Sequence, residues 1–289
     1  YGSKFWSQRR NGIMMKDKIQ EIREMFNHHG DAYPKEEGIY ISHELIERIN
    51  CFWFRKDNNQ KSGQLIIYLH GGAFTLGGIV SHAPMVSHFA GKFSIPVLFI
   101  DYSLAPENPF PTAINEVLKV YQTLLLKHAS SEIIFMGDSA GGGLAISVLS
   151  KINENKLPIP KCLVMISPWA DLTCSYTSHQ FNAKHDPVFG GKKILLQEMA
   201  SLYAGSSNVK EVSPIETVIH LFPPTLILAG STEVLLDDSK AVYEKIKRQQ
   251  TNTKLSIYKN QKHVWPLENI HTVESQKALI EIQKFITRE

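Results

Sequence analysis

The stretch IIFMGDSAGGG, which spans Ile133–Gly143, decides the fold of this chain. Its first residues are apolar, with branched and aromatic side chains, and they predict a buried strand. A turn with Ser139 at its apex follows, and then an apolar pattern at helical spacing predicts a helix. In this order the G-x-S-x-G motif has a mechanical meaning, because a strained turn lifts the serine hydroxyl clear of the sheet. We expect Gly137 and Gly141 to lack side chains because strand and helix cross closely here.

The same motif also fits a glycine-rich turn in an ordinary strand–helix unit that carries no chemistry. A short motif stays a hypothesis until its structural context is found. The deciding question is whether the rest of the chain supplies a base, an acid and an oxyanion hole for Ser139.

Length and composition indicate a globular α/β protein. A length of 289 residues and a hydrophobic content of 43% fit one domain over residues 1–289. The net charge of +3 comes from interspersed residues, and no face combines basic with aromatic side chains, so we expect no nucleic-acid partner. No apolar run reaches the length of a membrane span.

Cysteine usage and the N-terminal sequence predict a cytoplasmic protein. Cys51, Cys162 and Cys174 are an odd number without pairing or metal-type spacing, which favours reduced, buried thiols. The N-terminus lacks the basic, apolar and small-residue progression of a secretory signal.

Strands and helices alternate along most of the chain. Alternating runs at 38–45 and 49–55 predict an antiparallel pair at a sheet edge. Continuous apolar runs predict buried strands at 64–69, 96–100, 133–136, 162–166, 225–229 and 255–258. Helices are expected at 15–26, 82–93, 112–128, 237–248 and 274–287. The alternation predicts a mostly parallel central sheet with helices on both faces, whose sites form at the carboxyl ends of the strands.

One long connection breaks the alternation. Between Asp171 and Pro223 about fifty residues carry no clear strand, and a connection of that length is usually functional. A helix is expected there over 192–203. We expect about 175–215, together with about 1–35, to form a small helical cap over the site.

The base is expected just past the last strand. A serine hydroxyl needs an adjacent base, which in turn needs an orienting carboxylate. In the chain order serine, acid, histidine, His263 stands at the position of the base. His271 precedes the last helix and is expected to be a surface residue.

The acid is expected in the loop after the strand at 225–229. Glu233 lies there, whereas Asp237 and Asp238 stand where the next helix starts and at least one of them fits a capping role. The residues favour Glu233 and leave Asp237 open. Asp138 adjoins the serine, but its side chain is expected to point away and give local support.

An oxyanion hole needs backbone N–H groups aimed at the developing negative charge. One is expected from Ala140, at the start of the helix after the serine. Others fit Gly71 and Gly72, which follow a buried strand, although these glycines also fit a plain turn. Zinc-binding, phosphate-loop and dinucleotide motifs are missing from the sequence, so we expect no metal and no cofactor.

Several motifs together resemble one family. They are HGGAF at 70–74, DYSLAPENPFP at 101–111, GDSAGG at 137–142, ISPWAD at 166–171, PPTLILAGSTEVLLDD at 223–238 and HVW at 263–265. With these motifs the chain resembles the bacterial hormone-sensitive-lipase-like (family IV) esterases of the α/β-hydrolase superfamily. The resemblance implies that fold, with Ser139 as nucleophile, His263 as base and Glu233 as acid. It also implies Gly71, Gly72 and Ala140 as amide donors.

Two residues depart from the family pattern. Ala73 replaces the third glycine of the family's usual HGGGF. Ser103 replaces the arginine of its DYRLAPE and removes any ion pair that the arginine makes. Neither change removes a group that the resemblance makes catalytic.

The resemblance implies a cofactor-independent serine carboxylesterase that cleaves short- to medium-chain esters through an acyl-serine intermediate. An amidase or lactone hydrolase remains open, because one triad serves several acyl groups. A non-catalytic ligand receptor of the same fold is a further alternative, but such receptors have typically lost the histidine that is present here as His263. The expected partner is a small-molecule ester, and a homodimer is compatible with the sequence.

Overall fold

The computed structural model describes residues 13–56, 63–186 and 193–287. In this part of the chain, eight strands form one sheet in the order β1-β2-β4-β3-β5-β6-β7-β8. The strands are β1 (Ile39–Ile46), β2 (Ile49–Lys56), β3 (Leu65–Leu69), β4 (Val97–Ile100), β5 (Ile133–Asp138), β6 (Cys162–Ile166), β7 (Thr225–Gly230) and β8 (Thr253–Tyr258).

Helices cover both faces of the sheet. The α-helices are α2 (Ile13–Asn27), α3 (Ile79–Phe93), α4 (Thr112–Leu125), α5 (Ala140–Glu154), α6 (Ser178–Phe181), α7 (Lys193–Ala204), α8 (Leu236–Lys247), α9 (Trp265–Glu268) and α10 (Val273–Ile286). Short 3₁₀ turns are η1 (His28–Asp31), η2 (Ser130–Glu132) and η4 (Pro214–Glu216). None of the helices in the described ranges is long and apolar enough to cross a membrane.

The sheet has the predicted mixed topology. β1 pairs antiparallel with β2, and β2 pairs antiparallel with β4. All other neighbouring strands, from β4 through β3 to β8, run parallel. This is the mostly parallel sheet of the α/β-hydrolase fold, and it brings the carboxyl ends of β3, β5, β6, β7 and β8 to one edge.

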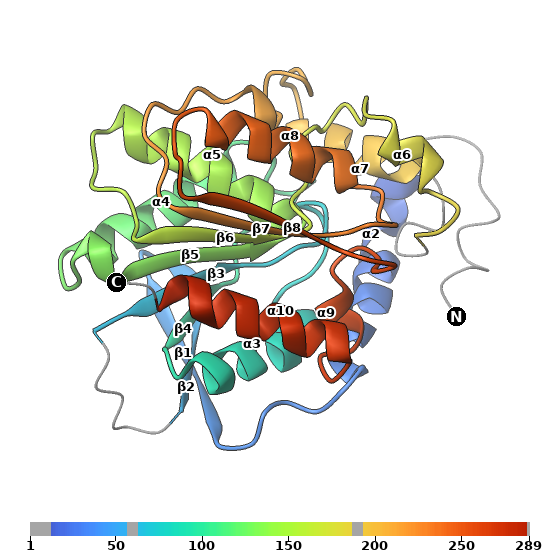
Figure 1. The fold of residues 1–289 in the computed structure, drawn as a ribbon. Helices are drawn as coiled ribbons and strands as arrows, with labels where there is room; N and C mark the ends of the chain where they lie inside the picture. The colour runs from blue at the N-terminus through green and yellow to red at the C-terminus, as the bar shows by residue number, and fades with distance from the viewer. Residues whose placement is uncertain (1–12, 57–62, 187–192, 288–289) are drawn as a thin grey trace.

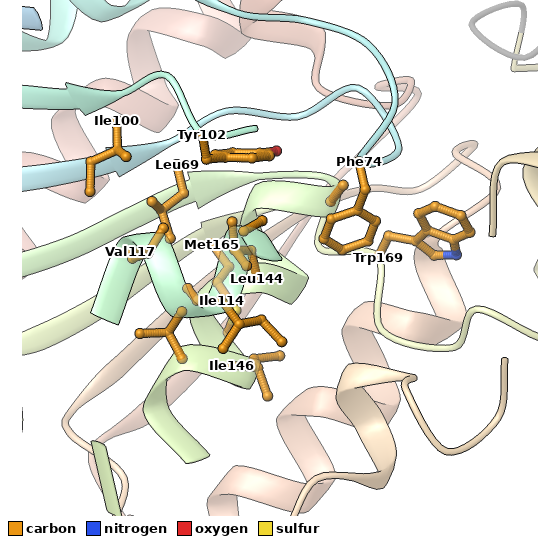
Figure 2. Packing of buried hydrophobic residues seen from close by; sticks show 14 of the residues in the cluster. Leu69, Phe74, Ile100, Tyr102, Ile114, Val117, Leu144, Ile146, Met165 and Trp169 are labelled. Carbon is orange, nitrogen blue, oxygen red and sulfur yellow. The ribbon is translucent and has the colours of Figure 1, made fainter. Parts of the chain in front are cut away.

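Two layers of apolar packing fill the space between the sheet and the helices. α3, α9 and α10 lie on one face, and α4, α5 and α8 lie on the other (Figure 1). Figure 2 shows the second layer, in which side chains of α4 and α5 pack against β3 and β6. Every residue of β3, β5, β6 and β7 is buried. Burial on both faces explains why their sequences are continuous apolar runs rather than alternating ones.

Element boundaries differ from the predicted ones where a distant contact decides them. α3 begins at Ile79, before the predicted residue 82, because the Asp101 carboxylate after β4 accepts the Ile79 N–H at 3.2 Å. A helix start needs such an acceptor for its unpaired N–H groups. The short α9 after His263 was not predicted, and α4 ends at Leu125 rather than at 128.

Candidate active site

Ser139 occupies a strained turn between β5 and α5. Its φ and ψ are 51° and −122°, a conformation that L-residues rarely adopt outside functional sites. A Cβ at Gly137 would lie 2.7 Å from backbone atoms of Gly141, and a Cβ at Gly141 would collide with the backbone of Leu69 and His70. The prediction that both glycines permit a close crossing is therefore confirmed.

His263 lies against the serine hydroxyl. Its Nε2 is 2.9 Å from the Ser139 Oγ, and only 4% of each residue is exposed. Burial lowers the pKa of the His263 imidazole, while the negative charges of Asp186 and Asp138 work to raise it. A lowered pKa keeps the ring neutral at neutral pH, which is the form that accepts a proton. The structure thus brings the predicted nucleophile and base together.

The other late histidine lies away from this pair. His271 is exposed, and its ring packs edge-on against the rings of Tyr33 and His88. This is the surface position that the sequence predicts.

Glu233 lies in the loop after β7, close to the loop that carries the base. Its Oε2 accepts hydrogen bonds from the Ser167 hydroxyl at 2.6 Å and from the Gly230 N–H at 3.1 Å. The two loops are tied together, because the Thr232 N–H and hydroxyl both donate to the Gln261 carbonyl. The other carboxylate oxygen, Oε1, is buried and accepts no hydrogen bond from the described residues.

Two opposing effects set the charge of Glu233. Complete burial raises the pKa of its carboxyl well above the ordinary value, and the charges of Asp186 and Asp238 raise it further. Hydrogen bonds from Ser167 and Gly230 favour the ionised form and lower the pKa. The ionised carboxylate therefore depends on the groups that surround it.

Asp237 and Asp238 have other partners. The Asp237 Oδ2 accepts the Ser178 N–H at 2.9 Å, and its Oδ1 accepts from Lys240 at 2.9 Å. Asp238 is fully buried, and its Oδ1 accepts the N–H groups of Ala170 and Asp171. Both carboxylates hold segments around the start of α8, which leaves Glu233 as the better candidate for the acid.

The segment around α6 forms several hydrogen bonds with the loop that contains Glu233. The Asn182 side chain donates to the Glu233 carbonyl at 2.8 Å, and the Val234 N–H donates to the Asp186 Oδ2 at 3.0 Å. The Ser178 hydroxyl donates to the Val234 carbonyl at 2.7 Å. Backbone and side-chain bonds therefore fix this loop against α6, a connection that the sequence did not reveal.

A buried His–Asp pair completes this contact and is expected to stabilise the fold in a pH-dependent way. His179 Nε2 lies 2.6 Å from Asp238 Oδ2, and neither side chain is exposed. Removing one partner of such a pair leaves an uncompensated buried group, so His179→Leu should lower the free energy of unfolding by about 3 kcal/mol. Burial lowers the pKa of His179, but the bond to Asp238 outweighs it, and the pKa lies above its ordinary value.

A raised histidine pKa means that the pair's contribution is complete below the unfolded pKa of about 6.5 and fades as the pH rises through the folded pKa. The difference between wild type and His179→Leu in urea unfolding should thus be largest near about pH 6 and shrink toward about pH 9. His28→Leu, which breaks the exposed pair with Asp31, is the control and should leave stability unchanged. A difference that stays constant over this range would contradict the expectation.

The oxyanion loop differs from the prediction at Gly71. The Gly71 N–H already donates to the Asp138 Oδ1 at 3.0 Å, so it is not free to bind an oxyanion, and its assignment as a donor is wrong. Gly72 and Ala73 have φ angles of 115° and 52°, and their N–H groups donate to no acceptor among the described residues. Successive N–H groups in such a conformation form an anion-binding concavity. The geometry therefore favours the N–H groups of Gly72 and Ala73 over that of Gly71 as candidate oxyanion donors.

Asp138 supports this loop, as predicted. Its Oδ1 also accepts the Tyr68 hydroxyl at 2.6 Å, and its Oδ2 lies 3.5 Å from the His82 Nε2. Burial works to raise the pKa of Asp138, but the charge of His82 and the hydrogen bonds lower it more, and the pKa lies below its ordinary value. An anion held in this way fixes the Gly71 backbone beside the nucleophile.

The loop after β4 is stabilised without the family's arginine. Ser103 donates from its N–H and its hydroxyl to the two carboxylate oxygens of Glu116, at 2.7 Å each. The Tyr102 hydroxyl donates to the His70 carbonyl at 2.7 Å. Tyr102 therefore supports the oxyanion loop. Within the described ranges, no group of His, Cys, Asp and Glu is arranged to hold a metal ion.

Comparisons with known proteins identify the family of the chain. The family described as alpha/beta hydrolase fold matches residues 66–267 of the chain. An esterase from Acinetobacter venetianus is 34% identical over 234 residues, which are 78% of this chain and 75% of the relative. An acetyl-hydrolase from Streptomyces hygroscopicus is 32% identical over 223 residues, or 76% of this chain and 74% of the relative.

A solved structure extends the match to nearly the whole chain. The crystal structure of an esterase from the bacterial hormone-sensitive lipase family superposes with a TM-score of 0.90 at 28% identity, over 99% of this chain and 94% of that chain. The residues that the family model matches, 66–267, include both Ser139 and His263. The chain therefore belongs to the hormone-sensitive-lipase-like esterases of the alpha/beta-hydrolase superfamily, and it is a carboxylic ester hydrolase.

Proposed function

We propose that Ser139, His263 and Glu233 form a catalytic triad that hydrolyses short- to medium-chain carboxylic esters through an acyl-serine intermediate. The observation that carries the proposal is the 2.9 Å contact between the Ser139 hydroxyl and the His263 imidazole at a strained turn. A hydroxyl held in this way beside a neutral imidazole is the arrangement of an activated serine nucleophile.

The reaction proceeds in two halves. The Ser139 Oγ attacks the ester carbonyl carbon while His263 Nε2 takes the hydroxyl proton. The tetrahedral intermediate collapses as the imidazolium gives that proton to the leaving alcohol, and an acyl-serine remains. A water molecule, deprotonated by the same nitrogen, then attacks the acyl carbon. The bond from this carbon to Ser139 Oγ breaks as the imidazolium returns its proton to Oγ, and the acid product leaves.

Backbone amides carry the negative charge of the intermediate. The Ala140 N–H, at the first turn of α5, is one donor, and the helix dipole adds to it. Gly72 and Ala73 supply the others from the loop after β3. Each such donor contributes on the order of 10²- to 10³-fold to turnover in comparable sites.

Glu233 orients the base. Its unbonded Oε1 meets His263 Nδ1 in the reacting complex and stabilises the imidazolium. Catalytic hydrogen bonds are often long in unliganded structures and tighten when substrate binds. The contacts of Ser167 and Gly230 with Oε2 support this role because they leave Oε1 for the base.

A cap formed by about 1–35 and about 175–215 is part of the proposal, although residues 1–12 and 187–192 lie outside the described ranges. Arg23 of α2 donates to the carbonyls of Thr75 and Ala105, next to the oxyanion loop. Tyr203 of α7 stacks on Phe74 with ring centroids 3.9 Å apart. These contacts support a cap that closes over the ester.

A cytoplasmic location also belongs to the proposal. Cys51 and Cys162 are buried thiols outside any disulfide, which is typical of a reducing compartment. The homodimer that the sequence leaves open stays a prediction, and sedimentation of the full chain checks it.

A series of p-nitrophenyl esters tests the substrate class. An acetyl-hydrolase among the relatives supports a short acyl group. We expect kcat/KM to be highest for acetate, butyrate or octanoate and to fall by about tenfold or more for palmitate, because each excess methylene must find apolar space in the acyl site. A maximum at palmitate would contradict the assignment, and so would faster cleavage of the matched anilide, which would favour an amidase.

A further inference from the structure

The turn after β6 contacts the nucleophile, the proposed acid and the residue that follows the base. The Ile166 carbonyl accepts the Ser139 N–H at 2.9 Å, and the Trp169 N–H donates to the Ser139 carbonyl at 2.9 Å. Between these residues, the Ser167 hydroxyl donates to Glu233 Oε2 at 2.6 Å and accepts the Val264 N–H at 3.1 Å. Val264 directly follows the base, so one hydroxyl joins the acid to the chain that carries His263.

Ser167 itself is rigidly held. It is fully buried, and its N–H donates to the Leu228 carbonyl at 2.7 Å. Its φ is 53°, a left-handed conformation that a serine adopts at some cost in energy. The Ser167 hydroxyl uses both its donor and an acceptor site, and the residue is buried in a strained conformation. Its orientation is therefore fixed.

We propose that Ser167 is a positioning residue for ester hydrolysis. Its hydroxyl orients the Glu233 carboxylate so that Oε1 points toward the base, and it keeps Glu233 and the loop of His263 at a fixed distance from each other. The inference rests on the proposed role of Glu233. The G-x-S-x-G motif and the order of serine, acid and histidine do not predict a role for Ser167. Ser167 follows β6, whereas the three triad residues follow β5, β7 and β8.

Two physical consequences follow from the contact. A hydrogen bond to a charged carboxylate is among the stronger ones in proteins and sets its orientation. Ser167 also lowers the pKa of Glu233, against the effect of burial, and so favours the ionised form that an imidazolium needs. Both effects act on turnover through Glu233 and leave the binding of the ester unchanged.

The test compares Ser167→Ala with Ser167→Gly in the full chain. Glycine accepts a φ of 53° without strain, so the pair separates loss of the hydroxyl from backbone strain. Loss of a hydrogen bond to a charged group predicts that kcat for p-nitrophenyl butyrate falls by about 10- to 100-fold in both variants, with KM nearly unchanged. Ser213→Ala is the matched control, because Ser213 is equally buried and its hydroxyl accepts a backbone N–H but donates to the Val209 carbonyl instead of a carboxylate.

A double variant shows whether Ser167 acts through the acid. Groups that act as one unit give non-additive losses. In a Glu233→Gln background, Ser167→Ala should therefore cost little more, whereas a general loss of packing would reduce activity by the same factor in both backgrounds. The inference is overturned if either Ser167 variant keeps wild-type kcat, if only the alanine variant is impaired, or if the two losses multiply.

The role of Glu233 as the acid and the role of Ser167 in positioning it can be refuted separately. Full activity in Glu233→Gln alone would refute the proposed acid. An inactive Glu233→Gln beside a fully active Ser167→Ala would refute only the positioning role of Ser167.

Discussion

Ser139→Ala should lower kcat for p-nitrophenyl acetate and butyrate by about 10⁴- to 10⁶-fold, because removal of the nucleophile from a triad leaves only the oxyanion hole and substrate binding. The residual rate should show no burst of p-nitrophenol, since no acyl-enzyme forms. Steady-state and stopped-flow hydrolysis measure both quantities.

Two further variants make this result specific. Ser147→Ala removes a serine inside α5, the helix that follows Ser139. Ser147 is as buried as Ser139, and this variant should keep wild-type turnover. Ser139→Gly accepts the φ of 51° more easily than alanine and serves if the alanine variant folds poorly. Wild-type turnover in a folded Ser139 variant would show that Ser139 is not the nucleophile.

The second large effect is expected from Glu233→Gln. An amide at this position cannot stabilise the imidazolium and favours the wrong tautomer of His263, so we expect kcat to fall by about 10²- to 10⁴-fold. KM should change little, because Glu233 is fully buried and its carboxylate bonds to protein groups.

Asp237→Asn is the matched comparison. Asp237 is partly exposed and pairs with Lys240 and the Ser178 N–H, so its substitution should change kcat by less than about threefold. Hydrolysis of p-nitrophenyl butyrate by the two variants decides between the carboxylates. A larger loss in Asp237→Asn would move the role of the acid to Asp237.

Much of the fold follows from local sequence patterns. Continuous apolar runs predict the buried strands because parallel strands are covered on both faces. The turn that carries Ser139 could also be predicted from the sequence. Gly137 and Gly141 are required there because the backbone of β5 and α5 crosses closely at residues near Ser139. Ser139, His263 and Glu233 each follow a strand, so their convergence at one edge of the sheet follows from the topology.

The features that could not be predicted depend on contacts between distant segments. The carboxylate that engages the Gly71 N–H is 67 residues away in sequence, at Asp138. Nothing local distinguishes the amide of Gly71 from that of Ala73, although the alanine in place of a glycine marks the loop as unusual. The role of Ser167 has a weak signal in the Ser-Pro that ends a buried strand, but its two partners belong to other loops.

The contact of α6 with the loop that contains Glu233 could not be predicted for the same reason, because it joins segments that are distant in sequence. His179, Asn182 and Asp186 come from the long connection after β6, whose sequence has no strand pattern to place it. Pairwise hydrogen bonds of this kind are set by the assembled tertiary structure. They show that this connection holds the backbone of Glu233 and Val234 in place.

Covalent labelling of the full chain with a fluorophosphonate, followed by mass mapping of its peptides, tests directly whether Ser139 is the nucleophile. We expect one label, on the peptide that carries Ser139, and a loss of p-nitrophenyl butyrate hydrolysis in proportion to the labelled fraction. Hydrolysis that persists in fully labelled protein, or a label on another residue at the point of inactivation, would contradict it.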